Sequence, residues 1–505
     1  MKQIKTALIS VFYKNDIDKI VALLKQNGVQ IYSTGGTFDY IKRYDDTVST
    51  VESLTGYPSI LGGRVKTLHP KVFGGILGRT NLPSDQAEMS QYEIPQFDLV
   101  IVDLYPFEET VANTDDHEAI IEKIDIGGIS LIRAGAKNYN DVLIVPSQKH
   151  YAELIKLLDE QKCQTTLDDR RRFAKYAFAV SSHYDSAIYR WFANDDTDSE
   201  LRITEDKVTT LRYGENPHQK GFFYGDMDAL FDKLHGKELS YNNLLDLDAG
   251  LNLIREFDEP TFAILKHNNP CGLACRSTVR EAYLDALAGD PVSAFGGVLV
   301  CNRPIDLEAA EEINKLFIEV IVAPDYADGV LDLLFSKKNR VVLKLKNDSY
   351  ARQTVKTALN GYLLQDRDMH AETADDFRVV TNAAPTQEEI SDMVFANKIV
   401  KHSRSNAIVL AKGKQLYASG IGQTSRVDAL RQAVAKAKSF GFDLKGAVLA
   451  SDAFFPFADC VQIAHEEGIT AIVQPGGSVR DQESIDECNN SGISMVFTGY
   501  RHFKH

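Results

Sequence analysis

Two adjacent basic residues, Lys266 and His267, stand at the end of a predicted strand over Phe262–Lys266. The neighbouring ammonium group disfavours protonation of the imidazole, so His267 can accept a proton near neutral pH. The Lys266 ammonium can in turn stabilise negative charge that develops on an attacked carbonyl group. The two residues are therefore a candidate catalytic pair.

The same region is similar to half of a zinc-deaminase signature. That signature needs Pro-Cys-x-x-Cys and an upstream His-x-Glu. Here three residues separate Cys271 from Cys275, and His267 is followed by two asparagines. We therefore predict no zinc ion.

Two glycine-rich segments near the N-terminus have the composition of an anion site. Residues Ser33–Thr37 (STGGT) lie between a predicted strand and a predicted helix over Phe38–Tyr44, so backbone N–H groups and the helix N-terminus can converge on a phosphate. The second segment, Gly62–Leu77, places cationic side chains between two glycine pairs. A capped tight turn and a solvated charge run are the ordinary alternatives. Together the two segments favour phosphate binding.

A tyrosine, a carboxylate and a lysine follow in the same part of the chain. They are Tyr105, Asp125 (in IDIGG) and Lys137 (in RAGAKN). Ligands of open α/β sheets bind beyond the carboxyl ends of the strands, so we expect all three to meet the phosphate site. One pocket with these groups can move protons and stabilise an oxyanion. Taken singly, each is more typical of a structural residue.

Polar loops in the second half suit ligand binding better than packing. Leu211–Gln219 (LRYGENPHQ) carries Arg212 and Tyr213, and Ser451–Asp459 (SDAFFPFAD) places three phenylalanines between aspartates. Such an aromatic cluster usually belongs to a core, but in a turn it can hold a flat heterocycle. Further candidates next to predicted strands and helices are Phe295, Asn406, Arg426 and Ser478.

The spacing of apolar residues predicts elements that position these groups. Predicted strands alternate with helices such as Asp16–Asn27, which predicts a parallel sheet covered on both faces. The strands of the first part are Lys5–Val11, Val29–Ser33, Phe97–Leu104 and Asp141–Val145. A long helix over Asp168–Trp191, with Phe173 and Tyr184 on its apolar face, precedes an acidic polar stretch.

We place the domain boundary in that acidic stretch, between residues 1–198 and 199–505. The second domain also has an α/β pattern, and a weak break at residues 371–386 suggests two subdomains. No internal repeat is visible in the sequence.

Composition narrows the class of protein. The 505 residues carry a formal net charge of −15, which disfavours a nucleic-acid partner. No apolar run approaches the ~18 residues of a membrane helix, and the N-terminal run is interrupted by Ser10, so we predict a strand there and no membrane association. Six scattered cysteines fit reduced thiols, and we predict a cytoplasmic protein.

In chain order, these motifs resemble those of the bifunctional AICAR transformylase/IMP cyclohydrolase family. The matching segments are STGGT, RVKTLHPKV, IDIGG, RAGAKN, LRYGENPHQ, KHNNPCG, SAFGG, SDAFFPF and the C-terminal RHF. They extend from near the first residue to the last, which is too extensive for chance similarity.

The resemblance implies a fold and two activities. The N-terminal domain would be a methylglyoxal-synthase-like parallel α/β domain that closes formyl-AICAR to IMP with loss of water. The C-terminal domain would consist of two cytidine-deaminase-like α/β subdomains without zinc. It would move a formyl group from the cosubstrate 10-formyltetrahydrofolate to AICAR. The resemblance also implies a homodimer and is compatible with a potassium ion.

The resemblance further implies roles for individual residues. For ring closure, the phosphate would lie against Ser10, Ser33, Thr34, Gly35, Gly36, Thr37, Arg64 and Thr67. The reacting groups would be surrounded by Lys66, Tyr105, Asp125 and Lys137, with Lys137 transferring the proton. For formyl transfer, His267 would be the base, Lys266 would stabilise the oxyanion and Asn406 would bind the formyl oxygen. The remaining contacts to substrate or folate would be Arg212, Tyr213, Phe295, Glu319, Arg426, Phe454, Asp459, Ser478 and Arg501.

Two alternatives remain. The chain could be a transformylase alone with a regulatory nucleotide-binding domain, or a non-catalytic nucleotide sensor. A sensor has no need of a base beside an anion site, so Lys266, His267 and Lys137 favour the enzyme.

Overall fold

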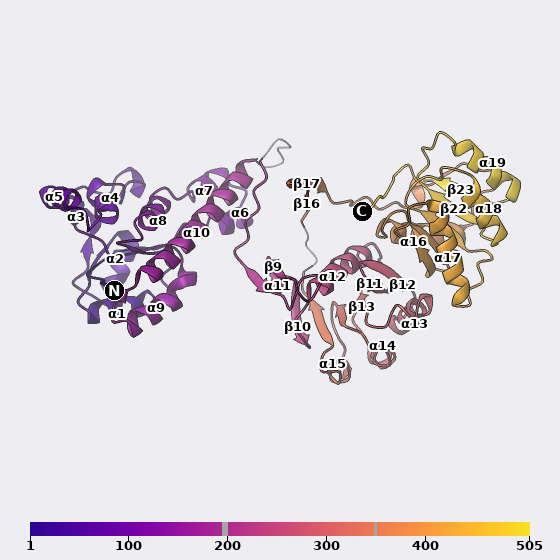
Figure 1. Ribbon diagram of the computed structural model, residues 1–505, viewed down its shortest axis with the longest axis horizontal. Coiled ribbons are helices and arrows are strands. Elements are labelled where there is room, and N and C mark those ends of the chain that lie inside the picture. Colours follow the sequence, from indigo (N-terminus) through magenta and orange to yellow (C-terminus); the bar gives the residue numbers. More distant parts are fainter. Residues whose placement is uncertain (194–199, 348–350) are drawn as a thin grey trace. The chain divides into compact units, whose positions relative to one another are not determined.

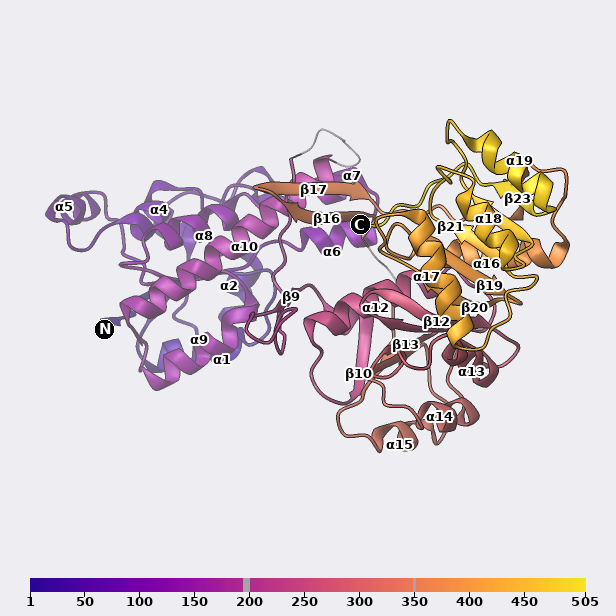
Figure 2. The same ribbon diagram turned by 45° about the vertical axis from the view of Figure 1, so that its right-hand side comes forward.

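The computed structural model describes residues 1–193, 200–347 and 351–505 (Figures 1 and 2). The chain divides into two compact units, Met1–Asp206 and Lys207–His505. The predicted boundary after residue 198 falls outside the described residues.

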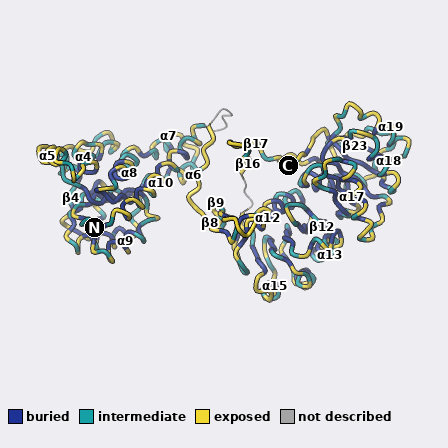
Figure 3. Tube along the Cα trace, in the orientation of Figure 1, coloured by how far each residue is buried: buried dark blue, intermediate teal, exposed yellow. Residues whose placement is uncertain are grey.

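The first unit is built on a five-stranded parallel sheet in the order β4-β3-β2-β5-β6. Its strands are β2 (Thr6–Ser10), β3 (Gln30–Ser33), β4 (Ser49–Thr50), β5 (Leu99–Val102) and β6 (Leu143–Val145). The four predicted strands occur, each shorter than expected at one or both ends. Alternate side chains of β2 and β5 enter two different apolar clusters, so both faces of the sheet are covered (Figure 3).

Helices α1 (Ile17–Gln26) and α9 (Tyr151–Glu160) cover one face of this sheet. Helices α4 (Pro70–Leu77), α8 (Gly127–Lys137) and the long α10 (Leu167–Ala193) cover the other. The remaining elements are β1 (Lys2–Gln3), α2 (Gly35–Ile41), α3 (Val51–Thr55), η1 (Leu61–Gly63), α5 (Pro83–Gln91), α6 (Phe107–Asn113), α7 (His117–Ile121), η2 (Gln148–His150) and β7 (Gln164–Thr165).

The second unit contains a twelve-stranded mixed sheet made of two halves with the same strand pattern. The order is β10-β15-β14-β13-β11-β12 in one half and β20-β19-β21-β22-β23-β18 in the other. Each half has an antiparallel hairpin (β11–β12 or β19–β20), followed by three parallel strands and an antiparallel edge strand. The halves meet where β12 pairs with β20. The structure therefore contains a repeat that is not visible in the sequence.

The elements of the first half are β10 (Phe231–His235), α12 (Tyr241–Ile254), β11 (Thr261–Lys266), β12 (Asn269–Cys275), α13 (Val279–Gly289), β13 (Val298–Cys301), α14 (Leu307–Ile313), β14 (Val320–Ala323), α15 (Val330–Phe335) and β15 (Val341–Leu345). Those of the second half are β18 (Arg378–Val379), α16 (Gln387–Lys401), β19 (Ile408–Lys412), β20 (Gln415–Gly420), α17 (Arg426–Ser439), β21 (Val448–Ser451), α18 (Asp459–Glu466), β22 (Ala471–Gln474), α19 (Asp481–Ser491) and β23 (Ser494–Phe497).

One apolar cluster runs across both halves beneath α12 and α16. The opposite face of the sheet is covered half by half, by α13–α15 and by α17–α19. The other elements of the unit are β8 (Val208–Thr210), β9 (Phe222–Tyr224), α11 (Met227–Leu230), the separate hairpin β16 (Gln353–Ala358) and β17 (Gly361–Asp366), and η3 (Ala374–Asp376). Within the described residues, no helix has the length and apolar character needed to cross a membrane.

Candidate active sites

A cavity of about 800 Å³ opens at the carboxyl ends of β2, β3 and β5 in the first unit. Ligands of parallel α/β sheets bind at this edge, so the cavity is where a substrate is expected. The predicted ring-closure residues that line it are Ser10, Thr34, Gly35, Gly36, Thr37, Arg64, Lys66, Thr67, Tyr105 and Asp125.

Backbone amides, hydroxyls and an ammonium group meet on one side of this cavity. Helix α2 begins at Gly35, three residues earlier than predicted, because Gly35 at φ 48° turns the chain directly from Thr34 into the helix. A Cβ atom placed on Gly35 would lie 3.8 Å from Lys66 Nζ, so this ammonium reaches the start of the helix. Ser10 Oγ lies 3.4 Å from Thr34 Oγ1. This donor set suits a phosphate group.

Two predicted phosphate ligands use their hydroxyl groups elsewhere. Ser33 Oγ donates to Ile9 O at 2.7 Å and is fully buried, and Ser33 does not line the cavity. Thr37 lines the cavity, but its hydroxyl donates to Val11 O at 2.8 Å and accepts from Val11 N at 3.2 Å. The Ser33 hydroxyl is therefore engaged within the protein, and a contact of Ser33 with phosphate stays a prediction. Ser33 ends a buried strand, and its side chain joins β3 to β2.

Asp125 and Tyr105 are brought together at the start of α8. The Asp125 carboxylate accepts the Gly128 N–H at 2.5 Å, and the backbone N–H groups of Ile129 and Tyr105 also donate to it. Burial raises the pKa of Asp125 against the effect of these N–H groups. Burial, and then the charge of Asp125, raise the pKa of Tyr105. A carboxyl group with a raised pKa beside a neutral phenol can hold or deliver a proton.

Lys137 does not line the cavity. It is the last residue of α8, ten residues after Gly127, which corresponds to about 15 Å along a helix. The next residue, Asn138, donates to Ile76 O and Gly78 O at the far end of α4. RAGAKN therefore continues the helix and carries Lys137 away from the strand ends, and its role in proton transfer stays a prediction.

Asp103 and Lys123 also line the cavity and were not predicted as site residues. Asp103 is buried, and its carboxylate accepts the backbone N–H groups of Phe12 and, at 3.0 Å, Tyr13. Lys123 Nζ lies 5.8 Å from the ring centres of both Phe12 and Tyr105. The position of Asp103 directly after an apolar strand is a signal that could have identified it.

Arg64 and Thr67 are fixed by neighbours on the other side of the cavity. Arg64 forms an ion pair with Glu122. Thr67 lies against the start of α8, where a Cβ atom on Gly127 would come within 3.1 Å of Thr67 Oγ1. Both residues therefore bridge the Gly62–Leu77 segment to the segment that carries Asp125.

The Gly63→Ala substitution is expected to reduce the activity of this site at least tenfold with little loss of stability beyond backbone strain. A Cβ atom on Gly63 would lie 2.8 Å from Lys66 Cε and 3.2 Å from Lys66 Nζ, so it must displace the ammonium group. The Lys66 side chain is flexible and can move aside. The main effect is therefore that its positive charge is displaced from the site, which lowers activity. Steady-state kinetics of the purified variant with the nucleotide substrate measure the loss.

Gly62→Ala is the matched control. Gly62 also has a positive φ, 65° against 90° for Gly63, so a side chain costs about 1–2 kcal/mol of backbone strain at either position. Nothing lies within 4 Å of a Cβ atom on Gly62. Equal activity losses in the two variants would contradict a specific role for Lys66.

In the second unit, Lys266 and His267 lie at the turn of the β11–β12 hairpin. Lys266 pairs with Asn269, and the two turn residues, His267 and Asn268, both have positive φ, 54° and 64°. Such two-residue turns follow the twist of the strands but usually contain Asn-Gly. The Asn268 N–H donates to Asp246 Oδ1 at 2.6 Å, which fixes the turn.

Asn269 connects this turn to the loop that carries Asn406. Its side chain donates to His267 O at 2.9 Å and accepts from Arg404 N at 3.2 Å. The loop leads into β19 of the second half, so the His267–Asn268 turn contacts, through Asn269, the loop that carries Asn406. That Lys266, His267 and Asn406 form one site stays a prediction.

Asn406 is held by a buried ion pair. Arg426 Nη2 donates to Asn406 Oδ1 at 2.7 Å, and Asn406 Nδ2 donates to Gln423 O at 2.9 Å. Arg426 is only 6% exposed and also pairs with the buried Asp452. The Arg426 guanidinium thus orients Asn406 within the protein, and its contact with substrate stays a prediction.

Phe295 lies beside Lys266 in the first half, and Glu319 precedes β14 of the same half. Lys266 Nζ donates to Phe295 O at 2.7 Å, and the Phe295 ring is 57% exposed beside Phe317. Glu319 pairs with Lys237 at 2.7 Å. An exposed ring beside the lysine is available to stack on a flat ligand.

The other predicted contacts are on loops of the second unit. Arg212 lies over the Tyr213 ring, and Arg501 lies over Phe503. Phe454 is at the surface, whereas its neighbour Phe455 is fully buried, so the aromatic cluster is part core and part surface. Asp459 begins α18, and the backbone N–H of Ser478 donates to Asp481.

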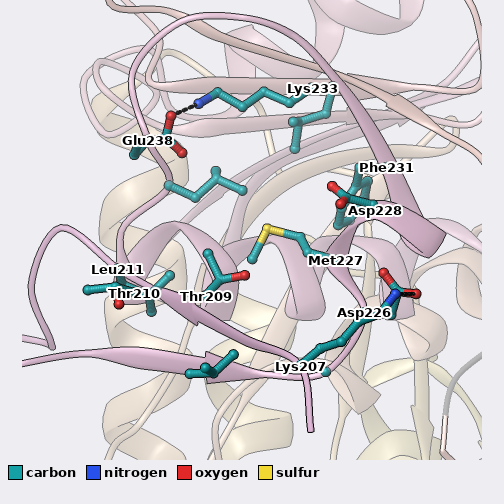
Figure 4. A pocket seen from close by; sticks show the side chains of 14 residues that line it. Lys207, Thr209, Thr210, Leu211, Asp226, Met227, Asp228, Phe231, Lys233 and Glu238 are labelled. Carbon is teal, nitrogen blue, oxygen red and sulfur yellow. Dashed lines mark hydrogen bonds and ion pairs between the residues drawn. The ribbon is translucent and has the colours of Figure 1, made fainter. Parts of the chain in front are cut away.

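A second cavity, of about 370 Å³, lies beside β8 and β10 (Figure 4). Met227 and Phe231 are part of its lining, and the Lys233–Glu238 ion pair borders it. Among the described residues that line it, none belongs to the predicted formyl-transfer set. Cys271 and Cys275 are four residues apart on β12, about 13 Å along an extended strand, which is too far to share one metal ion.

These features define a two-unit α/β enzyme, with a cavity at the strand ends of a parallel sheet in one unit and a duplicated sheet in the other. The chain belongs to the AICARFT/IMPCHase bienzyme family, whose model matches residues 135–436. The MGS-like domain model matches residues 16–130, and the predicted fold class is confirmed.

Full-length relatives support this assignment. The bifunctional purine biosynthesis protein PurH of Bacteroides thetaiotaomicron is 62% identical over 504 residues, covering 100% of this chain and 99% of that protein. The proteins of the same name from Acetivibrio thermocellus and Aquifex aeolicus are 46% and 47% identical, and each alignment covers 99% of this chain and 100% of the relative.

Proposed function

We propose that the chain catalyses the last two steps of IMP biosynthesis at two separate sites. The first step transfers a formyl group from 10-formyltetrahydrofolate to AICAR, and the second closes formyl-AICAR to IMP with loss of water. The observation that carries the proposal is the grouping of Lys66, Tyr105 and Asp125 beside a phosphate site in one cavity.

Ring closure is assigned to the first unit. The carboxamide nitrogen of formyl-AICAR attacks the formyl carbon, and water leaves. The phosphate lies against Ser10, Thr34 and the start of α2, while the Lys66 ammonium stabilises developing negative charge. Asp125 and Tyr105, with raised pKa values, handle the protons of the amide and of the departing water.

Formyl transfer is assigned to the second unit. The amine nitrogen of AICAR bonds to the formyl carbon, the bond from that carbon to N10 of the folate breaks, and N10 takes up a proton. His267 accepts the amine proton, and Lys266 stabilises the oxyanion of the tetrahedral intermediate. Asn406, oriented by Arg426, binds the formyl oxygen. The other predicted loop residues supply contacts to AICAR and folate.

Two activities in one chain have a chemical logic. The aminoimidazole amine is a poor nucleophile, so formyl transfer lies near equilibrium. Removal of the product by ring closure draws the first reaction forward.

One assay separates the alternatives. AICAR and 10-formyltetrahydrofolate are added to the whole protein, and tetrahydrofolate and IMP are both followed. We expect equal amounts of the two products. Tetrahydrofolate without IMP would favour a transformylase with a regulatory domain, and neither product would favour a nucleotide sensor.

We further propose that the protein is a cytoplasmic homodimer. The isolated β16–β17 hairpin supports this, because two-stranded hairpins are marginally stable in water. Its exposed apolar side chains, which a second copy of the chain would cover, are Val355, Leu359, Tyr362, Leu363 and Leu364. Light scattering is expected to give a mass of about twice 56.2 kDa, and a monomeric mass would contradict the proposal.

The six unpaired cysteines suit the cytoplasm. Potassium is a candidate activating ion, and activity in potassium can be compared with activity in sodium.

A further inference from the structure

Tyr184 of α10 holds the chain segment that presents Asp125. Its hydroxyl accepts the Asp125 backbone N–H at 2.8 Å and donates to Lys123 O at 2.6 Å. The two bonds lock both ends of the Lys123–Asp125 segment, and both of these residues line the cavity. Within the described part of the unit, no other side-chain hydroxyl forms a hydrogen bond with this segment.

The position of this hydroxyl is itself fixed. Tyr184 is 8% exposed, and its ring packs with Phe107, Ile120 and Ala187 in a small apolar cluster. Burial raises the pKa of the phenol, so it stays neutral and keeps a proton for Lys123 O. A neutral hydroxyl that donates once and accepts once is fully satisfied here.

The Asp125 carboxylate has a second anchor on its other side. The first turn of α8 donates the Gly128 N–H to it, so the side chain is oriented by α8 and the backbone by α10. Loss of either anchor lets the carboxyl group move relative to Tyr105 and the substrate. Misplacement of a reacting group by about 1 Å can cost about 100-fold in rate.

We propose that Tyr184 is a positioning residue for ring closure, acting through the backbone of Lys123 and Asp125. This inference rests on the proposed role of Asp125. The hydroxyl does not touch the substrate; it sets where the Asp125 carboxyl group and the Lys123 ammonium stand in the cavity.

The test compares Tyr184→Phe with Tyr151→Phe. Tyr151 is a buried tyrosine of the same unit whose hydroxyl has no hydrogen-bond partner among the described residues, so its removal deletes the same atom without breaking a bond. We expect kcat for ring closure of supplied formyl-AICAR to fall about 10- to 100-fold in Tyr184→Phe and less than about twofold in Tyr151→Phe. Because Ser10, Thr34 and the start of α2, which form the other part of the phosphate site, are not held by Tyr184, we expect KM and the Kd for IMP to stay within about threefold.

Asp125→Ala separates the inference from the function on which it rests. If Asp125→Ala loses ring closure while Tyr184→Phe matches Tyr151→Phe, the positioning role is overturned and the role of Asp125 stands. If Asp125→Ala keeps full activity, both are overturned. A rise in the Kd for IMP parallel to the loss in kcat would show a general loosening of the cavity and would also overturn the inference. Formyl transfer, measured on the same samples, is expected to remain unchanged.

Discussion

Replacement of His267 is expected to lower formyl transfer about 100- to 10,000-fold, the usual range for loss of a general base. Ring closure of supplied formyl-AICAR should stay within about twofold, because its site lies in the other unit. Tetrahydrofolate release from 10-formyltetrahydrofolate and AICAR measures the first activity, and IMP formation from formyl-AICAR measures the second.

The replacement residue must remove the imidazole without disturbing the backbone turn. His267 has φ 54°, so alanine adds strain to the turn, whereas asparagine is well tolerated there. His267→Asn should therefore lose formyl transfer as fully as His267→Ala while retaining the hairpin. His465→Ala, at an exposed position on α18, is the control for loss of an imidazole. Loss of both activities in His267→Asn would contradict two independent sites.

Lys66→Ala is expected to have the opposite effect. The ammonium group at the start of α2 would be removed, and ring closure should fall about 100- to 1,000-fold, as for loss of one stabilising donor. When AICAR and 10-formyltetrahydrofolate are supplied, formyl-AICAR should accumulate. Chromatographic analysis of the nucleotides over time measures this.

Lys71→Ala controls for the loss of positive charge from the same segment. Lys71 does not line the cavity, and its ammonium faces Glu93. It should therefore release IMP at the normal rate. Normal IMP release from Lys66→Ala would refute the assignment of Lys66, and a similar fall in Lys71→Ala would show a general electrostatic effect.

Local patterns were sufficient to predict the strands and the edge of the sheet where the glycine-rich segments line a cavity. Alternation of apolar runs with polar turns gave β2, β3, β5 and β6, and the strand ends of a parallel sheet meet at one edge. The resemblance supplied the order of the motifs and the two activities. The roles of individual side chains were harder to predict from the sequence, because hydroxyl and guanidinium groups can bind either a substrate or the protein backbone. Ser33 and Arg426 turned out to serve the protein itself.

Other features depend on contacts between distant parts of the chain. Lys137 is an example, because its motif forms the last part of α8 and the lysine lies ten residues after the start of that helix. Tyr184 was predicted only as part of an apolar helix face, since nothing local shows that its hydroxyl meets Lys123 and Asp125, about sixty residues earlier. The repeat in the second unit has diverged in sequence and is visible only in the order of its strands.

The duplicated sheet creates two equivalent crossings, and only one of them carries the catalytic pair. At the first, the His267–Asn268 turn meets the loop before β19 through Asn269. At its counterpart, the Gly413–Lys414 turn meets the loop before β11, where Lys414 pairs with Glu259.

The two crossings thus differ in their side chains: one turn carries Lys266 and His267, and the other carries an ion pair between the two halves. A single half, expressed alone, would inherit either the Lys266-His267 pair or Asn406, never both. Formyl transfer should therefore require both halves, because the residues proposed for it are divided between them.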